Sequence, residues 1–375
     1  MRDKPNSQDT KPLTYKRSGV DYSSIDPLKV NAQSSAASTA DNLKAFGMRE
    51  LPQSRGESAY VWEENDAYRA LVVEGLGTKS LVADAMYSLT GKSYYDQIAQ
   101  DTIAMIVNDL VVVGALPIVI NAYYALSDGN WMKDKQRAAD LVAGWTKACN
   151  LAGATWGGGE TPALKGIISP NTIDLAGSAV GIIKPKSRLI LGDKLEAGDS
   201  IVLIESSGIH ANGLTLVRSI ADKLKETYLT KLDDGQTLGN TILTPTHIYV
   251  ALVKELLEAE LDIHYMANIT GHGWRKIMRA NKQFSYVLNF VPDVPSEFSF
   301  IQKHAKVSNE EMYGNFNMGA GFAVFLPQSQ AKNVVGLAKK VGLKAWQAGQ
   351  VIEGKKQVTI KPLDITFGED SLEVR

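Results

Sequence analysis

Four short stretches of the chain carry acidic, amide, hydroxyl or cationic side chains close to glycines. In VVEGLGTKS (72–80), Glu74 could hold a metal ion and Lys79 could neutralise a phosphate as a point charge. Gly75 and Gly77 would let the backbone approach that phosphate closely. The spacing is not that of a Walker P-loop, since lysine does not directly follow the second glycine and the loop is too short. Taken alone, the stretch fits either a phosphate site or a plain turn after a strand.

The second stretch, DTIAMIVND (101–109), is typical of a helix. On a helix, Asp101 and Asn108 share one face and Asp109 lies beside them. An acid and an amide among apolar residues cost free energy unless something pairs with them. Mg²⁺ could supply that pairing, because it prefers oxygen ligands and often bridges carboxylates to substrate phosphates. A helix that is capped or cross-linked by an aspartate is the alternative.

The other two stretches could bind anions through their backbone. GGGET (157–161) puts three glycines before an acid, so exposed N–H groups could form an anion nest, and a tight turn is the alternative. SSGIHANG (206–213) lies between a predicted buried strand and a predicted helix start, where N–H groups and the helix dipole favour anions. It also offers two hydroxyls, an imidazole and an amide, a composition that a solvated loop explains less well.

Several isolated polar residues are weaker candidates. His272 lies inside the glycine turn NITGHGW (268–274), where the glycines would expose it. His247 and His264 fit surface or core histidines better than metal ligands. Cys149, in a predicted helix, is interpreted as a small packed hydrophobe.

The elements that must position these stretches alternate between strand and helix, which indicates an α/β or α+β fold. The expected strands are 71–75, 118–126, a run within 172–187, 201–204, 285–291 and 319–326. The expected helices are 97–113, 133–153 ending at Gly153, one from 214 and one after 243–246. GGGET is expected as a glycine turn after a strand, and 184–188 (KPKSR) as a domain boundary.

Composition excludes several classes of function. With 375 residues the chain is long enough for two domains, and its 44% apolar and 22% charged content is that of a soluble globular protein. A net charge of −1 gives no general attraction to nucleic acid or to anionic membranes. The single cysteine excludes an intramolecular disulfide and a cysteine zinc site, and it fits a reducing cytoplasm. Residues 1–13 are predicted to be a flexible tail without a signal peptide, and 110–126 is too short to span a membrane.

Taken in order, these stretches resemble the phosphoribosylformylglycinamidine cyclo-ligase family, also called aminoimidazole ribonucleotide synthetases. The resemblance begins at TYKRSGVD (14–21) and continues through VEGLGTK and IAQDTIAMIVNDLVVVGALP (98–117). It also includes GGETP, DLAGSAVG, GDSIVLIESSGIHANGLTLVR, LTPTHIYV, NITGHGW and EMYGNFNMGAGFAV, all in the family's order. No single motif carries it, whereas the ordered set over roughly residues 14–355 is specific.

The resemblance implies a two-domain subunit with mixed sheets and helices packed on them. Residues 14–185 would form an ATP-binding and dimerisation domain, and residues 186–375 a C-terminal α/β domain that completes the substrate cleft. The family uses ATP to convert formylglycinamidine ribonucleotide to aminoimidazole ribonucleotide, ADP and phosphate, in purine biosynthesis. ATP phosphorylates the formyl amide oxygen to give an iminophosphate, and the amidine nitrogen then closes the ring and expels phosphate. The implied cofactors are ATP and Mg²⁺, and the implied partner is a second copy of the chain.

The resemblance also assigns roles to residues. It implies that ATP and its metal are bound by Glu74, Gly75, Gly77, Thr78, Lys79, Asn108, Asp109, Gly158, Gly159, Glu160 and Thr161. The implied metal ligands among the candidates are Glu74, Asp101, Asn108 and Glu160. The substrate side would be lined by Ser206, Ser207, Gly208, His210, Asn212, Gly213, Thr270, Gly271 and Gly273. The catalytic residues would be His210, Lys79 and Asp101, with His210 polarising the amide or moving a proton. Replacing Asp101 or Lys79 by alanine is expected to abolish turnover and leave the fold intact.

The chain departs from the family's pattern around this expected cleft. Glu74 stands where the family has aspartate, His247 where it has arginine, and His272 where it has glycine. The family's glycine-rich N-terminal loop is replaced by GMRELPQSRGESAY (47–60). These changes leave two alternatives: a paralogous ATP-dependent ligase or kinase acting on another small substrate, and a catalytically inactive nucleotide-binding dimer.

Overall fold

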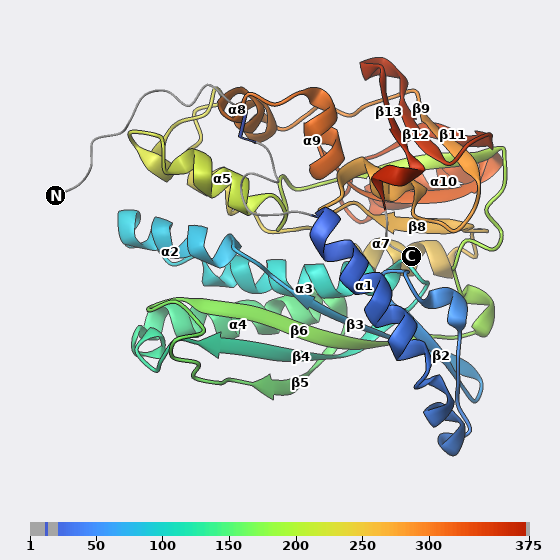
Figure 1. Cartoon of the computed structure of the whole chain (residues 1–375), viewed down its shortest axis with the longest axis horizontal. Helices are drawn as coiled ribbons and strands as arrows, with labels where there is room; N and C mark the ends of the chain where they lie inside the picture. Colours follow the sequence, from blue (N-terminus) through green and yellow to red (C-terminus); the bar gives the residue numbers. More distant parts are fainter. Residues whose placement is uncertain (1–11, 14–21, 373–375) are drawn as a thin grey trace.

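The structure is a computed structural model that describes residues 12–13 and 22–372 of the 375-residue chain. The motif TYKRSGVD (14–21) and most of the predicted tail therefore lie outside the described residues. Leu13 is described, and its backbone N–H donates to the carbonyl of Ala305 at 2.9 Å. A long helix, α1 (Tyr22–Ala37), follows and crosses the front of the molecule in Figure 1. From Pro27 onward most of its residues are exposed.

The first part of the chain builds a six-stranded sheet in the order β1-β2-β3-β6-β4-β5. The strands are β1 (Arg49–Glu50), β2 (Tyr60–Glu64), β3 (Ala67–Gly75), β4 (Leu116–Leu126), β5 (Thr155–Glu160) and β6 (Ile173–Ile183). Three helices accompany them: α2 (Lys79–Thr90), α3 (Tyr95–Val111) and α4 (Lys135–Ala152). The apolar α3 packs across β3, β6 and β4, and α4 lies beside it. Alternate residues of β3 and β6 are buried under α3, as the two-residue period of a strand requires.

The second part builds a seven-stranded sheet in the order β13-β12-β9-β11-β7-β10-β8. Its strands are β7 (Asp199–Glu205), β8 (Tyr265–Asn268), β9 (Phe284–Leu288), β10 (Ala320–Pro327), β11 (Ala345–Glu353), β12 (Gln357–Ile360) and β13 (Ile365–Gly368). Its helices are α5 (Leu214–Ala221), α6 (Leu238–Ile242), α7 (Val250–Glu258), α8 (Ser296–Ala305), α9 (Asn309–Asn315) and α10 (Ala331–Lys340). Buried β7 lies inside this sheet, so its apolar run IVLI (201–204) has no polar face.

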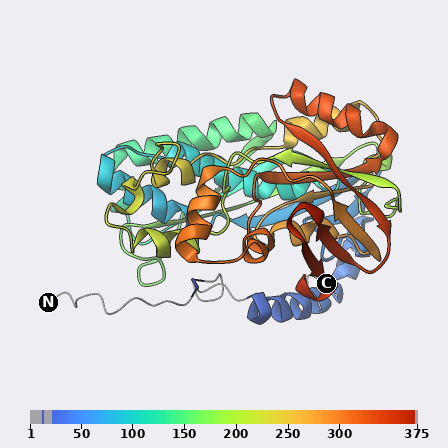
Figure 2. The same ribbon diagram turned by 90° about the horizontal axis from the view of Figure 1, so that it is seen from above.

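Helices α2 and α3 lie between the first sheet and the second half of the chain (Figure 1). Contacts of α3 with α7 and β8, and of α2 with α6, join the two halves. Figure 2 shows α1 (blue) on the opposite side of the molecule from α4 (green). Polar residues of α3 that face the second half of the chain are therefore buried by tertiary packing.

The predicted α/β (α+β) class and most predicted elements are confirmed. Helix 97–113 corresponds to α3, and 133–153 corresponds to α4, which ends at Gly153 in the left-handed conformation. The prediction of a glycine turn at GGGET was wrong, because Gly157–Gly159 belong to edge strand β5. Two of these glycines are required by close packing: a Cβ on Gly159 would lie 2.1 Å from the Ala122 carbonyl oxygen of β4, and one on Gly157 2.7 Å from Val119.

Candidate functional site

Two carboxylates from the first half of the chain meet an amide from the second half. Glu74 is the next-to-last residue of β3 and is on the α3 side of the sheet, and Asp109 is in the last turns of α3. Asn268 ends β8, and its Nδ2 donates to Asp109 Oδ1 at 2.6 Å. Burial, followed by the negative charge of Asp109, raises the pKa of the Glu74 carboxyl to about 7. The charge of Asp109 therefore opposes the ionisation of Glu74.

A buried ammonium group completes this cluster. Lys276 Nζ donates to Thr270 Oγ1 at 2.5 Å, and both residues are at least nine-tenths buried. Burial lowers the pKa of Lys276, and the nearby carboxylates of Asp109 and Glu74 oppose that shift. We call Glu74, Asp109, Asn268, Thr270 and Lys276 the junction cluster.

The glycine turn after β8 places Lys276 in the junction cluster. Gly273 has φ of +53°, and a Cβ there would lie 2.2 Å from the carbonyl oxygen of Tyr313. Only glycine fits that position, which begins a 3₁₀ helix at Gly273–Met278. The backbone N–H of Gly273 donates to the Thr270 carbonyl at 2.7 Å, so the chain turns back tightly. This turn brings the Lys276 side chain back to Thr270, six residues earlier in the chain.

The predicted metal ligand Asp101 is committed to an internal ion pair. Lys79 Nζ lies 2.8 Å from each oxygen of the Asp101 carboxylate, and both side chains are fully buried. Thr246 donates to the same carboxylate through its N–H at 2.9 Å and its Oγ1 at 2.5 Å. Burial raises the pKa of Asp101 and lowers that of Lys79, while their mutual attraction opposes both shifts. The Thr246 donors also oppose the shift of Asp101. Lys79 also donates to the carbonyl of Thr244 at 3.0 Å, so it is held away from an incoming phosphate.

Asn108 is committed in a similar way. Its Nδ2 donates to the His247 carbonyl at 2.7 Å, and its Oδ1 accepts from the Tyr249 N–H at 2.9 Å. Gln100 donates to the Thr246 carbonyl at 2.9 Å. The backbone of segment 244–249 is thus fixed to α3 by hydrogen bonds with side chains along the helix. Asp101 and Asn108 therefore cross-link α3 to segment 244–249, which was the alternative to a metal site. In this structure their side chains are bound to protein groups.

Glu160 does not join Glu74. The strand registers place Glu160 beside Tyr123 of β4, Tyr123 beside Ala176 of β6, and Ala176 beside Gly75 of β3. Glu160 therefore shares a sheet face with Gly75, and Glu74 points to the opposite face. Three strand spacings, about 14 Å in all, separate the two ends of this row. The four predicted metal ligands are not brought together, because sequence order does not show which face of the sheet each acid occupies.

The turn between β3 and α2 is open. Gly75 and Gly77 are exposed, Thr78 is half-buried, and Gly77 has φ of +74°. Thr78 caps α2 without a side-chain hydrogen bond to the helix. The first N–H groups of a helix have no carbonyl partner one turn earlier in the helix, and those of the 12-residue α2 face this turn. Gly158, Gly159, Glu160 and Thr161 are exposed at the end of β5.

The predicted substrate loop, residues 206–213, is tied down at both ends. Ser206 Oγ donates to Asn317 Oδ1 at 2.9 Å, and Asn317 Nδ2 donates to the Gly208 carbonyl at 2.9 Å. Ser207 Oγ donates to the Pro245 carbonyl at 2.7 Å. Gly213 has φ of +82° and packs against Phe316, so a Cβ there would overlap the ring. The loop is held in one shape, with half-buried Asn212 near Met105 of α3.

His210 lies inside this loop. It is 2% exposed, and its Nε2 accepts from the Ser207 N–H at 3.2 Å. Burial, the neighbouring His247 and Lys79 lower its pKa well below the usual value, so the imidazole is neutral. Its ring fits only because position 321 is glycine, since a Cβ there would lie 2.6 Å from His210 Cε1. In this structure the His210 side chain stabilises the loop by accepting a hydrogen bond from the Ser207 backbone N–H.

Glu297, in the first turn of α8, is a buried acid beside the same loop. Its side chain is 2% exposed, and its Oε1 would lie 2.7 Å from a Cβ on Gly208. Burial raises its pKa to about 7, although the positive charge of Lys79 lowers it slightly. Sequence inspection missed Glu297, because an acid in an otherwise ordinary helix gives no signal of burial.

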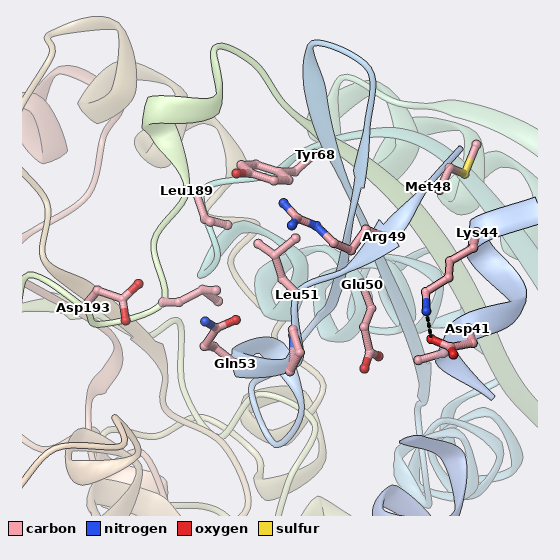
Figure 3. A pocket seen from close by; sticks show the side chains of 13 residues that line it. Asp41, Lys44, Met48, Arg49, Glu50, Leu51, Gln53, Tyr68, Leu189 and Asp193 are labelled. Atoms are coloured by element: carbon pink, nitrogen blue, oxygen red, sulfur yellow. Dashed lines mark ion pairs between the residues drawn. The ribbon is translucent and has the colours of Figure 1, made fainter. Parts of the chain in front are cut away.

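The cavity shown in Figure 3 lies away from the junction cluster and from loop 206–213. A cavity of about 640 Å³ lies between residues 40–53, Tyr68 and residues 189–193 (Figure 3). Its charged lining residues include Asp41 and Lys44, which form an ion pair at 2.8 Å. None of its lining residues belongs to the junction cluster or to loop 206–213.

Comparison with known proteins identifies the family of this chain. The family model for the N-terminal domain of AIR synthase related proteins matches residues 56–183, and that for the C-terminal domain matches residues 196–361. A curated phosphoribosylformylglycinamidine cyclo-ligase of Carboxydothermus hydrogenoformans is 34% identical over 358 residues, which cover 93% of this chain and 98% of that protein. The chain belongs to the phosphoribosylformylglycinamidine cyclo-ligase family. The resemblance recognised in the sequence is confirmed.

Solved structures show the same fold beyond the cyclo-ligases. A structure of AaThiL complexed with AMPPCP and TMP has a TM-score of 0.57 at 15% identity, covering 83% of this chain and 89% of that chain. A structure of T. maritima PurL complexed with FGAR has a TM-score of 0.56 at 15% identity, covering 84% of this chain and 46% of that chain. At such identities the likeness shows the fold alone.

In this member of the cyclo-ligase family, inspection of the sequence also missed Asn268, Lys276 and Thr246. Each had a weak signal: Asn268 and Lys276 flank the glycine turn, and Thr246 belongs to LTPTHIYV. Their importance depends on contacts across the domain junction with Asp109 and Asp101. Such contacts are absent from any local pattern.

Proposed function

We propose that this protein catalyses the ATP-dependent ring closure of formylglycinamidine ribonucleotide to aminoimidazole ribonucleotide, releasing ADP and phosphate. The observation that carries the proposal is the 34% identity to a curated cyclo-ligase over nearly the full length of both chains. The junction cluster supports it, because a reaction without a protein nucleophile needs charge stabilisation and positioning from its enzyme.

Glu74 and Asp109 are the residues that we propose to hold Mg²⁺. Burial and the negative charge of Asp109 raise the Glu74 pKa, and a divalent cation bound there would favour the ionised carboxylates. Carboxylate oxygens are the ligands that Mg²⁺ prefers. When bound, the ion supplies positive charge for nucleotide phosphates. Glu74 reaches one methylene further than the family's aspartate.

The open turn between β3 and α2 is proposed to receive nucleotide phosphates. Gly75 and Gly77 expose the backbone there, and the first N–H groups of α2 favour an anion. Thr78 adds a hydroxyl at the same point. Lys79 contributes by fixing segment 244–249 to α2 and α3.

Loop 206–213 is proposed to bind the formylglycinamidine ribonucleotide, together with Thr270, Gly271 and Gly273. In the proposed reaction the γ-phosphoryl group of ATP passes to the formyl oxygen. The amidine nitrogen then bonds to the formyl carbon, loses a proton, and expels the oxygen with phosphate. Because Asn317 and Pro245 hold the loop, its backbone is ready to keep the two reacting groups of the substrate close together.

We also propose that two copies of the chain pair through the first sheet. The face away from α3 carries Val73 at 70% exposure and Leu71 at 36%, with half-buried Val180 and Ile182 beside them. A contiguous apolar sheet face of this kind marks an interaction site. A second copy is the partner that a symmetric oligomer would place there.

A cytoplasmic location is part of the proposal. Within residues 12–13 and 22–372, no helix is long and apolar enough to cross a membrane. The only cysteine, Cys149, is buried with a free thiol, which fits a reducing compartment.

The proposed function is tested by incubating purified protein with Mg–ATP and formylglycinamidine ribonucleotide. Aminoimidazole ribonucleotide and ADP should form in equal amounts. ADP release that does not depend on this substrate, without the aminoimidazole product, would point to the paralogous ligase or kinase instead. Nucleotide binding without turnover would indicate the inactive dimer.

A further inference from the structure

We propose that Lys276 binds a phosphoryl group at the junction cluster, in the role that the sequence had suggested for Lys79. The inference rests on the proposed function, because it takes the ligand to be the nucleotide or the phosphorylated substrate. It concerns a residue of the glycine turn that neither the motif pattern nor the family resemblance assigned.

The position of the Lys276 ammonium group favours contact with a ligand. It is buried at the junction, where β3, α3, β8 and the turn after β8 converge. An ammonium group has three N–H donors, and Thr270 Oγ1 accepts from Lys276 at 2.5 Å. Among the described residues, no carboxylate forms an ion pair with Lys276, although Asp109 and Glu74 act on it electrostatically. The remaining donors are thus available to a ligand oxygen.

The charge of the junction cluster favours a phosphoryl ligand once a metal ion is bound. Ionised Glu74 and Asp109 carry two negative charges and Lys276 carries one positive charge, so the ionised cluster has a net charge of about −1. A divalent cation on the carboxylates changes this to about +1, which attracts a phosphoryl group into a water-poor site. Without Lys276 the loaded cluster would be neutral, and that attraction would disappear.

The neighbouring cations Lys79 and Arg279 are already bound to other groups of the protein. Lys79 is fully buried between Asp101 and the Thr244 carbonyl. Arg279 donates to the Gly56 carbonyl at 2.9 Å and to Ser58 Oγ at 3.0 Å, which fixes the segment after β1. Within the described part of the chain, Lys276 is by contrast a buried cation that forms no ion pair with a carboxylate.

The test compares Lys276→Met and Lys276→Arg with wild type. Lys303→Met, an exposed lysine of α8, is the control. Calorimetry measures three affinities separately: AMPPCP with Mg²⁺, formylglycinamidine ribonucleotide, and Mn²⁺ alone. Losing a charge-assisted hydrogen bond should weaken at least one phosphorylated ligand by about 10- to 100-fold in Lys276→Met. Lys276→Arg should recover part of that loss. Mn²⁺ should bind as well as in wild type or better, since a like charge is removed.

The three affinities separate the possible outcomes. A loss for AMPPCP alone assigns Lys276 to the nucleotide, and a loss for the ribonucleotide alone assigns it to the substrate. The proposal is overturned if both bind Lys276→Met as they bind wild type, or if Mn²⁺ affinity falls in parallel with them. It is also overturned if wild type binds neither phosphorylated ligand. A wild type that binds them but makes no product contradicts the proposed function and leaves the role of Lys276 standing.

Discussion

At the scale of single residues, replacing one partner of the fully buried ion pair Lys79–Asp101 should lower the stability of the fold. Asp101→Asn leaves the Lys79 ammonium buried without its counter-charge, which costs about 3–5 kcal/mol of unfolding free energy. The double variant Lys79→Met, Asp101→Asn should lose much less than the sum of the single losses. Chemical denaturation of the four proteins in a double-mutant cycle measures this coupling.

The exposed pair Lys340–Glu255 provides the control for that cycle. Lys340→Met should cost less than about 1 kcal/mol, because exposed ion pairs contribute little. If the losses of unfolding free energy from the Lys79 and Asp101 substitutions were additive, the two side chains would not be coupled as an ion pair. The sequence-based expectation that single alanine variants keep an intact fold is revised accordingly, because it took both residues to face a ligand.

Glu297 gives a pH-dependent prediction. Its pKa is about 7 in the folded protein against an ordinary value of 4.5, so the folded state binds the proton more tightly. Its contribution to stability is therefore complete below pH 4.5 and is lost as the pH rises through 7. Glu297→Gln removes this loss, so the variant should gain up to roughly 3 kcal/mol relative to wild type between pH 4.5 and 8.

Thermal or urea unfolding at several pH values measures this gain. Glu226→Gln, at an exposed glutamate, should show no pH-dependent difference from wild type. A difference between Glu297→Gln and wild type that stays constant across the pH range would show that Glu297 has no raised pKa.

At the scale of elements, α3 is the part that joins the two halves of the chain. Asn108→Ala removes both hydrogen bonds to segment 244–249 and leaves the His247 carbonyl and the Tyr249 N–H unpaired. The cost should be about 2–3 kcal/mol. Amide hydrogen exchange at Tyr249 should accelerate, while Ile204 in the core strand β7 stays protected.

Asn150→Ala, on the exposed side of α4, is the matched control and should leave both amides unchanged. If Tyr249 exchanges at the wild-type rate in Asn108→Ala, the clamp between α3 and segment 244–249 contributes nothing to local stability.

Elements were predictable from the sequence where one local cause dominates. The apolar run IVLI could only be a buried strand, and Gly153 could end α4 because glycine adopts the left-handed conformation without strain. The glycines of β5 misled the prediction, because their reason is close packing on β4, which is not a local property.

The candidate site was predictable only in part for the same reason. Glu74 and Asp109 could be singled out as acids near glycines or within an apolar helix. Their meeting with Asn268 and Lys276 depends on how two sheets pack. Nor does the sequence show that Asp101 points to Lys79, or that Glu160 lies on the other face of the sheet from Glu74.

At the scale of the whole molecule, the open face of the first sheet predicts self-association. Val73→Glu places a charge on a side chain that is 70% exposed, so the fold should keep its stability within about 0.5 kcal/mol. The same charge would be buried in a pair of sheets, so the dimer should dissociate. Sedimentation velocity measures the change of mass.

Ile167→Glu is the control, because Ile167 is 78% exposed and lies in the connection between β5 and β6, outside the sheet. It should sediment like wild type. A monomeric wild type, or a dimeric Val73→Glu variant, would contradict pairing through this face.

In the proposed reaction, the molecule uses ATP to activate the formyl oxygen of its substrate for ring closure. The most direct measurement follows that oxygen, with formylglycinamidine ribonucleotide carrying ¹⁸O in the formyl group. Incubation with Mg–ATP should transfer the ¹⁸O to inorganic phosphate, one label for each aminoimidazole ribonucleotide formed, as read by mass spectrometry. Unlabelled phosphate, or ADP without the aminoimidazole product, would contradict the claim.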